Sequence, residues 1–277
     1  MICTIKSLIS VINKRSKATL GLLVKQLNYT KMNDLTGKVV IVTGASKGIG
    51  AMIALRLAEA GASVVINFAH GIDAANETVR KITEMGFRAI PVQADVSKSA
   101  DVVALFDEAI RVFGRVDVLV NNAGVMITKS IKDTTDEDFE KQFGINVKGT
   151  FNTLREAATR LSDNGSVINF STSVNRVMLP GYGTYVASKS AVEQLTRVFA
   201  KEVGTRGINV NSVSPGPTNT ALFTNGKPQE VIDRLAAQSA FNRIGEPDDI
   251  AKVIVFLASD EAKWISAQNI GLNGGFA

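Results

Sequence analysis

Short runs of β-branched residues alternate along this chain with longer segments that have the pattern of helices. The strand-like runs lie at 38–43, 62–67, 88–92, 116–120, 166–170, 208–213 and 269–272. The helical segments lie at 48–60, 72–85, 100–113, 136–161, 183–203 and 247–258. This alternation predicts βαβ units and a parallel sheet covered on both faces. It continues without a linker or a repeat, so we expect an α/β fold with one doubly wound domain over residues 32–277 and a parallel seven-stranded sheet.

Composition excludes several other classes of protein. Hydrophobic residues make up 45% of the chain and charged residues 21%, which is typical of a globular core and not of a disordered chain. Cys3 is the only cysteine, so no intrachain disulfide can form. No apolar run reaches the roughly 18 residues that span a bilayer, and we expect no membrane association. Because His70 is the only histidine and no carboxylate pair has ligand spacing, we expect catalysis without a metal.

The net charge of +5 is concentrated at the N-terminus. Residues 1–31 hold six of the 31 lysines and arginines and none of the 26 acids, so the remaining 246 residues are nearly neutral. A neutral body predicts no nucleic-acid partner. The first 31 residues could act as an organelle transit peptide, but they hold a single arginine. We favour a disordered extension, or a working start at Met32, together with a cytoplasmic location; organelle targeting is the alternative.

The loop after the first predicted strand reads TGASKGIG at residues 43–50. Glycines permit a sharp turn there and let a pyrophosphate approach the N-terminus of the following helix, where free N–H groups point outward. The spacing Gly-x-x-x-Gly-x-Gly differs from the Gly-x-Gly-x-x-Gly fingerprint. A glycine-rich turn can also be only a tight connection. Its place on the first βα unit favours a dinucleotide site in a Rossmann-type domain.

The end of the second predicted strand indicates which dinucleotide binds. An acidic residue there would accept the ribose 2′-hydroxyl of NAD. Residues 67–70 read NFAH and contain no acid, and Lys47 in the glycine loop could reach a 2′-phosphate. Both observations favour NADP(H), although Lys47 could equally be an ordinary solvated lysine.

Tyr185 and Lys189 are four residues apart on a predicted helix and so share one face. A cation beside a phenol favours the phenolate and lowers the tyrosine pKa from its usual value of about 10. We therefore expect Tyr185 to act as a general acid toward a carbonyl.

Together these residues resemble the short-chain dehydrogenase/reductase family in its single-domain form. The resemblance covers residues 35–277 and includes the family's TGxxxGIG loop at 43–50, its NNAG element at 121–124 and its YxxxK motif at 185–189. Asn146 matches the family's helix asparagine, residues 215–216 its PG motif, and residues 243–251 its C-terminal RxGxPxDIA stretch.

The resemblance implies roles for the matching residues. Tyr185 would donate the proton, Lys189 would hold the nicotinamide ribose, and Asn146 would hold a water in a proton relay. The expected cofactor-binding residues are Gly44, Ser46, Lys47, Gly48, Ile49, Gly50, Asn67, His70, Asp95, Val96, Asn122, Ala123, Gly124, Tyr185, Lys189, Pro215, Gly216, Thr218 and Thr220. Trp264 and residues 271–275 are expected to serve packing near a subunit interface, since the family commonly forms dimers and tetramers.

A serine hydroxyl would orient the carbonyl, and here the chain departs from the commonest pattern. The family's usual spacing of thirteen residues before the tyrosine falls on Thr172, which Ser171 and Ser173 flank. We expect Ser173 to take this role if the following loop is one residue shorter, with Thr172 as the alternative. Arg176, Met178, Leu179 and Tyr182 in that loop are expected to wall the substrate pocket.

The favoured function is an NADPH-dependent reductase that converts a small-molecule aldehyde or ketone to an alcohol, working as a homo-oligomer and most simply as a tetramer. One alternative is reduction of a 3-oxoacyl thioester on an acyl carrier, for which Lys129, Lys132 and Arg176 are candidate contacts, although acids at 133–140 offset them. A second alternative is a dinucleotide sensor without turnover, but such a chain would be expected to lose Tyr185 or Lys189. Substrate contacts are expected from residues 127–132, 174–182 and 218–238.

Overall fold

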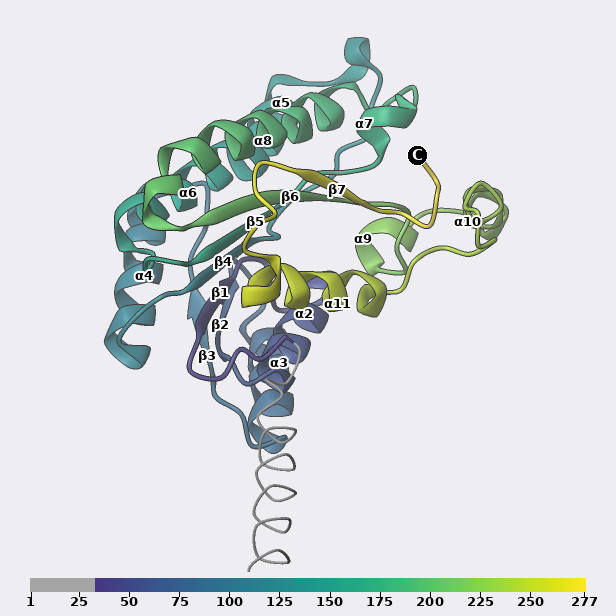
Figure 1. Ribbon diagram of the computed structural model, residues 1–277. Helices are drawn as coiled ribbons and strands as arrows, with labels where there is room; N and C mark the ends of the chain where they lie inside the picture. Colours follow the sequence, from purple (N-terminus) through teal and green to yellow (C-terminus); the bar gives the residue numbers. More distant parts are fainter. Residues whose placement is uncertain (1–32) are drawn as a thin grey trace, which may run out of the picture.

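Seven parallel strands form a single sheet in the computed structural model, which describes residues 33–277 (Figure 1). The strands are β1 (Val39–Val42), β2 (Ser63–Phe68), β3 (Ala89–Gln93), β4 (Val118–Asn121), β5 (Ser166–Phe170), β6 (Asn209–Pro215) and β7 (Asn269–Leu272). Their order across the sheet is β3-β2-β1-β4-β5-β6-β7. This confirms the predicted doubly wound α/β fold. Because the order reverses between β1 and β4, a ligand crevice is expected where these two strands end.

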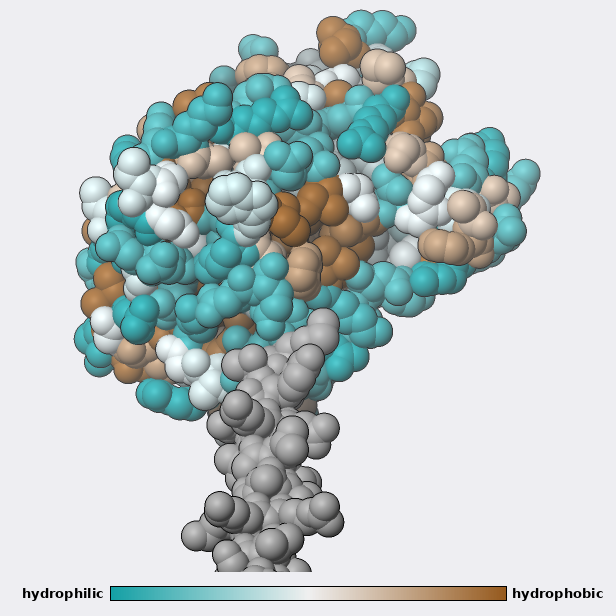
Figure 2. Space-filling view, viewed as in Figure 1, coloured by the Kyte–Doolittle hydropathy of each residue, from teal (hydrophilic) through white to brown (hydrophobic). Residues whose placement is uncertain are grey.

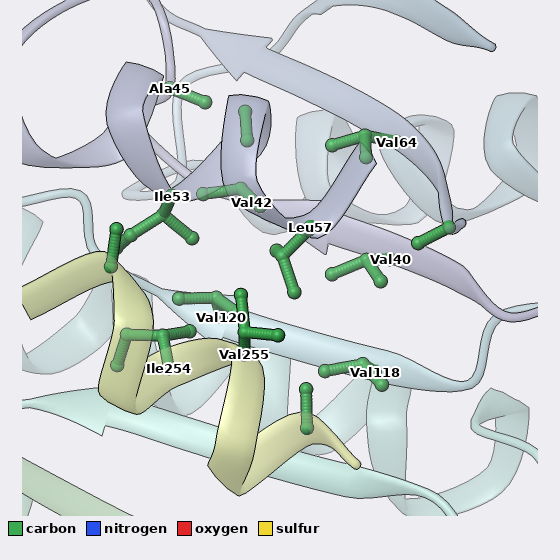
Figure 3. Packing of buried hydrophobic residues seen from close by; sticks show 14 of the residues in the cluster. Val40, Val42, Ala45, Ile53, Leu57, Val64, Val118, Val120, Ile254 and Val255 are labelled. Carbon is green, nitrogen blue, oxygen red and sulfur yellow. The ribbon is translucent and has the colours of Figure 1, made fainter. Parts of the chain in front are cut away.

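Three long helices cover each face of the sheet (Figure 1). One layer contains α2 (Gly48–Glu59), α3 (Ile72–Glu84) and α11 (Pro247–Ala258). The other contains α4 (Ser99–Phe113), α6 (Gly149–Arg160) and α8 (Gly183–Glu202). Successive side chains of a strand point to opposite faces of the sheet, so each strand contributes to both layers. Val40 and Val42 pack with the first layer and Ile41 with the second. In Figure 3, side chains of β1, β2 and β4 meet Ile53 and Leu57 of α2 and Ile254 and Val255 of α11.

The helical segment predicted at 136–161 is interrupted. It comprises α5 (Asp136–Phe143), a π-helical turn η2 (Gly144–Lys148) and α6. Thr135 caps α5, because its hydroxyl accepts from the backbone N–H of Asp138 and the Asp138 carboxylate accepts from the backbone N–H of Thr135. The π turn carries the buried Asn146. Such turns often mark functional sites.

Several short elements were not predicted from the sequence. They are η1 (Ile131–Asp133), α7 (Val174–Val177), η3 (Gly204–Arg206), α9 (Ala221–Thr224), α10 (Gln229–Ala236) and η4 (Asp260–Ala262). α7, α9 and α10 follow the carboxyl ends of β5 and β6, so they border the edge of the sheet where ligands bind. The N-terminal extension at 1–31 lies outside the described residues. Between residues 33 and 277, no helix has the length and apolar character needed to cross a membrane.

A chain of buried side-chain hydrogen bonds links the central strands to two helices. The Asn121 amide on β4 donates to the Asn169 side chain on β5 (2.8 Å), and the Asn169 amide donates to the Thr196 hydroxyl on α8 (2.8 Å). On the other side, the Thr153 hydroxyl of α6 donates to Asn121 Oδ1 (2.8 Å). All four side chains are buried. The network therefore fixes α6 and α8 against the sheet beneath the site.

The Trp264 side chain is fully exposed on the single chain, so its expected packing near a subunit interface stays a prediction. Apolar side chains also gather on the visible face in the region between β7 and α11 (Figure 2). Val253 and Phe256 of α11, and Ile270 and Leu272 of β7, are only partly buried where they pack on the core. This face therefore leaves apolar surface uncovered.

Candidate active site

The glycine loop after β1 lies tightly against the loop after β4. Gly44 has φ +63°, and a Cβ placed on it would come within 3.0 Å of the Ala123 Cα. A Cβ on Gly50 would lie 2.4 Å from the Gly44 carbonyl oxygen and 2.5 Å from Asn122 Nδ2. Side chains at these two positions would push the two loops apart, so the glycines are required for the approach.

Two amide side chains hold the glycine loop in place. Asn122 donates through Nδ2 to the carbonyl oxygens of Thr43 (2.9 Å) and Gly44 (3.0 Å). Asn67, at the end of β2, accepts from Gly44 N–H (3.3 Å) and donates to the carbonyl oxygen of Ala94 (3.0 Å). Asn67 is buried and its side chain is engaged by backbone groups. The Asn67 side chain therefore supports the glycine loop, and a contact between Asn67 and the cofactor stays a prediction.

The residues present fit a phosphorylated dinucleotide. The N-cap of α2 is Lys47, which makes no side-chain cap, so the first N–H groups of the helix face the glycine cradle. Lys47 is exposed and forms no ion pair within residues 33–277. At the end of β2, Ala69 is half-buried and His70 exposed, and neither carries negative charge. The cradle accommodates a pyrophosphate, and its outer edge lacks an acid that would repel a 2′-phosphate.

The loop after β3 has a charged and an apolar residue side by side. Burial opposes ionisation of Asp95, but hydrogen bonds from the hydroxyl and N–H of Ser97 outweigh it and lower the Asp95 pKa. Val96 is buried against Gly149, where an added Cβ would lie 2.6 Å from the Val96 Cγ2. The Val96 carbonyl oxygen accepts from the Asn152 amide (2.9 Å). Asp95 is therefore the partly exposed group of this loop, and Val96 anchors it to α6.

Three neighbouring hydroxyls follow β5, and only one reaches Tyr185. The Ser171 hydroxyl donates to Glu193 Oε1 (2.6 Å), and the Ser173 hydroxyl donates to the Pro215 carbonyl oxygen (2.9 Å). Thr172 lines the cleft, and its interaction with the Tyr185 side chain acts to lower the Tyr185 pKa. Ser173 ties β5 to β6 and does not line the cleft. The structure therefore favours the alternative, Thr172 at the thirteen-residue spacing, over Ser173.

Burial dominates the electrostatics of the tyrosine and lysine. Loss of hydration raises the pKa of Tyr185 to about 12, although its hydrogen bond with Thr172 acts in the opposite direction. Burial lowers the pKa of Lys189 to about 8. The Lys189 ammonium donates to the Phe170 carbonyl oxygen (2.8 Å). The expected fall in the Tyr185 pKa is therefore absent from the free chain, and Tyr185 carries its proton throughout the neutral range.

Asn146 occupies the π turn and holds the loop that begins at Val125. Its Oδ1 accepts from Val125 N–H (2.9 Å), and its Nδ2 donates to the Val125 carbonyl oxygen (2.9 Å) and to Ser188 Oγ (3.0 Å). A Cβ on Gly124 would lie 3.2 Å from both Asn146 Oδ1 and Lys189 Nζ. Gly124 therefore lets Asn146 and Lys189 approach the same point. The Asn146 amide is engaged by protein groups, and its part in a water relay stays a prediction.

The loop after β6 faces the glycine loop across the cleft. A Cβ on Gly48 would lie 3.6 Å from the Thr220 methyl group. Thr218 forms a backbone bridge with Gly245, and its hydroxyl donates to the Gly216 carbonyl oxygen (2.9 Å). The four predicted residues of this loop that line the cleft are Pro215, Gly216, Thr218 and Thr220.

A cleft of about 890 Å³, counted with its open mouth, brings these groups together. Its polar end contains Asn122, Thr172, Tyr185 and Lys189, and Lys189 is its only charged side chain. Most of the remaining apolar side chains come from short helices and loops, apart from Ile49 of α2 and Phe170 of β5. The remaining apolar residues are Ile49, Val125, Met126, Phe170, Val174, Leu179, Tyr182, Pro217, Leu222, Phe223, Leu235 and Phe276.

Part of the expected substrate wall lines the cleft and part does not. Leu179 and Tyr182 line it, whereas Arg176 is exposed and Met178 is 73% exposed. Residues 127–132 do not line the cleft, where Val125 and Met126 take their place. Phe276 was missed entirely. The only signal for it was an aromatic residue directly after Gly274-Gly275.

Comparison with known proteins places the chain in a family. Residues 44–277 match the family model described as enoyl-(acyl carrier protein) reductase. An NADPH-dependent aldehyde reductase-like protein, chloroplastic, from Arabidopsis thaliana is 42% identical over 87% of this chain and 95% of its own length. A probable tetrahydroxynaphthalene reductase from Zymoseptoria tritici is 38% identical over 89% of this chain and 97% of its own length.

Solved structures are similar over the same region. The angucycline C-6 ketoreductase LanV, with bound NADP, superposes with a TM-score of 0.83, at 40% identity over 88% of this chain and 96% of that one. A short-chain dehydrogenase/reductase from Serratia marcescens gives a TM-score of 0.84, at 34% identity over 87% of this chain and 98% of that one. Sequence, fold and site agree, and the chain belongs to the short-chain dehydrogenase/reductase family of oxidoreductases.

Proposed function

We propose that this chain is an NADPH-dependent carbonyl reductase that reduces an aldehyde or ketone to an alcohol. The observation that carries the proposal is the pairing of a protonated Tyr185 with the Thr172 hydroxyl at the polar end of an apolar cleft. The names of two similar proteins, an NADPH-dependent aldehyde reductase-like protein and an angucycline C-6 ketoreductase, refer to the reduction of an aldehyde and of a ketone, and they support the same chemistry.

Three side chains have separate roles in the proposed reduction. When NADPH is bound, its nicotinamide would supply the hydride that reduces the carbonyl carbon. Thr172 and Tyr185 both donate to the carbonyl oxygen, which orients it and stabilises the negative charge that develops there. Tyr185 then transfers its proton to that oxygen and completes the alcohol. Lys189 provides positive charge beside the phenol, which favours the phenolate left after transfer.

NADP(H) is the cofactor. The acid-free end of β2 and the exposed Lys47 favour the phosphorylated dinucleotide, and the NADP bound in the similar ketoreductase structure supports the same choice. We expect Gly44, Gly48 and Gly50 to cradle the pyrophosphate, and Lys47 and His70 to lie toward the 2′-phosphate. We expect Asp95 to contact the adenosine part of the cofactor.

The proposal is tested by following NADPH oxidation with a panel of carbonyl compounds. The panel should contain aliphatic and aromatic aldehydes, diketones, quinones, sugars and 3-oxoacyl thioesters, and the Tyr185→Phe variant is the control. We expect turnover of uncharged apolar carbonyls that the control lacks. NADPH binding without turnover of any member would contradict the proposal and favour a dinucleotide sensor.

Reduction of a 3-oxoacyl thioester is the second candidate, since the matching family model is described by an acyl-carrier reaction. An acyl carrier is acidic and would need basic residues at the mouth of the cleft. Of the candidates, Lys129 forms an ion pair with Asp138. Turnover of a 3-oxoacyl thioester at a kcat/KM above that of every free aldehyde and ketone would establish this alternative.

We also propose that the chain forms a homo-oligomer, with a tetramer as the expected form. The fully exposed Trp264 and the partly buried apolar residues of β7 and α11 support it, because a monomer would leave this surface in water. Light scattering after gel filtration should give a multiple of the 29.5 kDa chain mass. A mass equal to one chain at micromolar concentration would contradict this.

For location, we propose the cytoplasm for the protein that starts at Met32. Two relatives with chloroplastic in their names favour organelle import of the longer chain as the alternative. Fluorescent fusions of the full chain and of residues 32–277 separate the two, because only the full chain would enter an organelle.

A further inference from the structure

The segment after β7 turns back on itself and contributes one residue, Phe276, to the lining of the cleft. In Figure 1 it runs beyond β7 toward α9 and then turns back toward α7. Backbone hydrogen bonds hold it on two sides. The Leu272 carbonyl oxygen accepts from Gly216 N–H (3.0 Å), and the Gly274 carbonyl oxygen accepts from Ala240 N–H (2.8 Å). The segment is thus attached both to the loop after β6 and to the chain that follows α10.

Asn273 fixes the turn that reverses the chain. Gly274 and Gly275 both have left-handed backbone, at φ +59° and +75°, which glycine adopts without strain. Asn273 Oδ1 accepts from Gly275 N–H (3.1 Å), and its Nδ2 donates to the backbone oxygen of Ala277 (3.0 Å). The Asn273 carbonyl oxygen accepts from Phe276 N–H (3.0 Å). The residues on both sides of Phe276 are therefore tied to one side chain.

This turn places Phe276 in the wall of the cleft. The wall also includes Leu179 and Tyr182, from the chain after α7, and Leu222 and Leu235, from α9 and α10. None of these side chains is charged. Because Tyr185 and Thr172 would hold the carbonyl, these uncharged side chains are left to contact the rest of the substrate.

We propose that Phe276 determines substrate specificity by stacking on a flat aromatic portion of an uncharged carbonyl substrate, and that Asn273 is the positioning residue that presents its ring. The inference rests on the proposed carbonyl reduction and deepens it. A phenyl ring offers a large rigid face, and aromatic rings pair in stacked or edge-to-face arrangements at little conformational cost. Tyr182 supplies a second ring, and its edge-to-face contact with Tyr185 at 6.4 Å fixes its orientation.

Steady-state kinetics with two aldehydes tests the role of the ring. 2-Naphthaldehyde is flat and reaches the wall, whereas propanal is too short to do so. In Phe276→Ala, KM for 2-naphthaldehyde should rise about tenfold, since one stacked ring commonly contributes that much to affinity. The kcat/KM for propanal and the Kd for NADPH should stay the same. Phe276→Tyr keeps a ring and should retain the wild-type KM for 2-naphthaldehyde. Phe276→Leu keeps apolar bulk without a ring and should show the raised KM of Phe276→Ala.

Phe241→Ala is the matched control. Phe241 is 70% exposed, approaches Gly274 of the same turn and lies outside the cleft, so its loss should leave KM for 2-naphthaldehyde unchanged. An equal rise in Phe241→Ala and Phe276→Ala would show that a loosened turn, and not the ring, is responsible, and would overturn the proposal. An unchanged KM in Phe276→Ala would also overturn it.

The positioning role of Asn273 is tested by measuring KM and kcat separately for the two aldehydes. Asn273→Ala should reproduce the rise in KM for 2-naphthaldehyde, with kcat for propanal and Tm nearly unchanged. Asn273→Asp keeps the acceptor for Gly275 and should recover part of the affinity. A fall in Tm and in turnover of both aldehydes would show a structural role only.

Failure of the proposed function can be distinguished from failure of this inference. If the wild-type protein reduced neither these aldehydes nor any other member of the carbonyl panel, carbonyl reduction would be wrong. Binding of 2-naphthalenemethanol to the NADP-loaded protein, followed by fluorescence, would still report on the wall. Weaker binding in Phe276→Ala than in Phe241→Ala supports the ring contact, and equal binding in these two variants overturns it.

Discussion

The cofactor end and the substrate end of the cleft are formed by different kinds of interaction. At the cofactor end, the loops after β1 and β4 are in backbone contact. The side chains of Asn67 and Asn122 form hydrogen bonds with backbone groups of the glycine loop. At the substrate end, apolar side chains meet from short helices and from the chain after β7. The first arrangement depends on backbone geometry and the second on side-chain shape. A single substitution should therefore affect recognition at one end and leave the other intact.

The largest expected effect lies where the two ends meet. Tyr185→Phe should lower kcat by about 10²–10⁴-fold, because the ring still fills its place but carries no proton to donate. The Kd for NADPH should stay within about twofold of the wild-type value, since the cofactor end is untouched. Single-turnover NADPH oxidation measures the first quantity and fluorescence titration the second. Retention of most turnover would mean that another group donates the proton.

The next effect separates the neighbouring hydroxyls. Thr172→Val keeps the shape of the side chain and removes the group that meets Tyr185, so kcat should fall by about 10²-fold, as for the loss of one oxyanion donor. Ser173→Ala should lower kcat much less, because the Pro215 carbonyl oxygen still accepts from Ser173 N–H (3.0 Å). Its effect should appear in Tm. The reverse ranking of kcat would return the carbonyl-orienting role to Ser173.

A charge at the end of β2 should act on the cofactor end alone. Phe68 is buried in the core, so Ala69 is the position to change. Ala69→Asp should lower the ratio of kcat/KM for NADPH over NADH by about tenfold, because an acid repels the 2′-phosphate and accepts from a ribose hydroxyl. Ala69→Asn is the uncharged control. A change in KM for the carbonyl substrate in Ala69→Asp would show that the two ends are coupled.

The smallest expected effect is a pH dependence of NADPH binding. Burial lowers the pKa of Lys189 to about 8, so the ammonium is present below that pH and is lost as the pH rises through it. If only the charged form holds the ribose, the affinity for NADPH should fall about fourfold between pH 7 and pH 8.5. Fluorescence titration across this range measures it, with Lys47→Ala as a control that should keep the same profile. A flat profile would show that Lys189 stays charged.

The difference between the two ends also explains what the sequence could predict. Gly44, Gly50 and Asn122 are required by local backbone geometry, so their spacing in the sequence reveals them. Tyr185 and Lys189 are visible because one helix turn separates them. Phe276 shares no local pattern with the rest of the wall, and only the turn at Asn273 brings it there. The choice between Thr172 and Ser173 depended on which hydroxyl the Pro215 carbonyl oxygen would bind, a contact between distant segments.

The buried hydrogen bonds that link Thr153, Asn121, Asn169 and Thr196 determine which parts of the protein unfold together. α6 continues from the turn that holds Asn146, and α8 carries Lys189. Neither helix can separate from β4 and β5 without leaving amide groups unsatisfied in the interior. The catalytic groups should thus belong to the same cooperative unfolding unit as the central strands, whereas α9 and α10 lie outside this network. Amide hydrogen exchange should be slow through α6 and α8 and fast in α10, so the protein can vary its substrate wall while its reacting groups stay fixed.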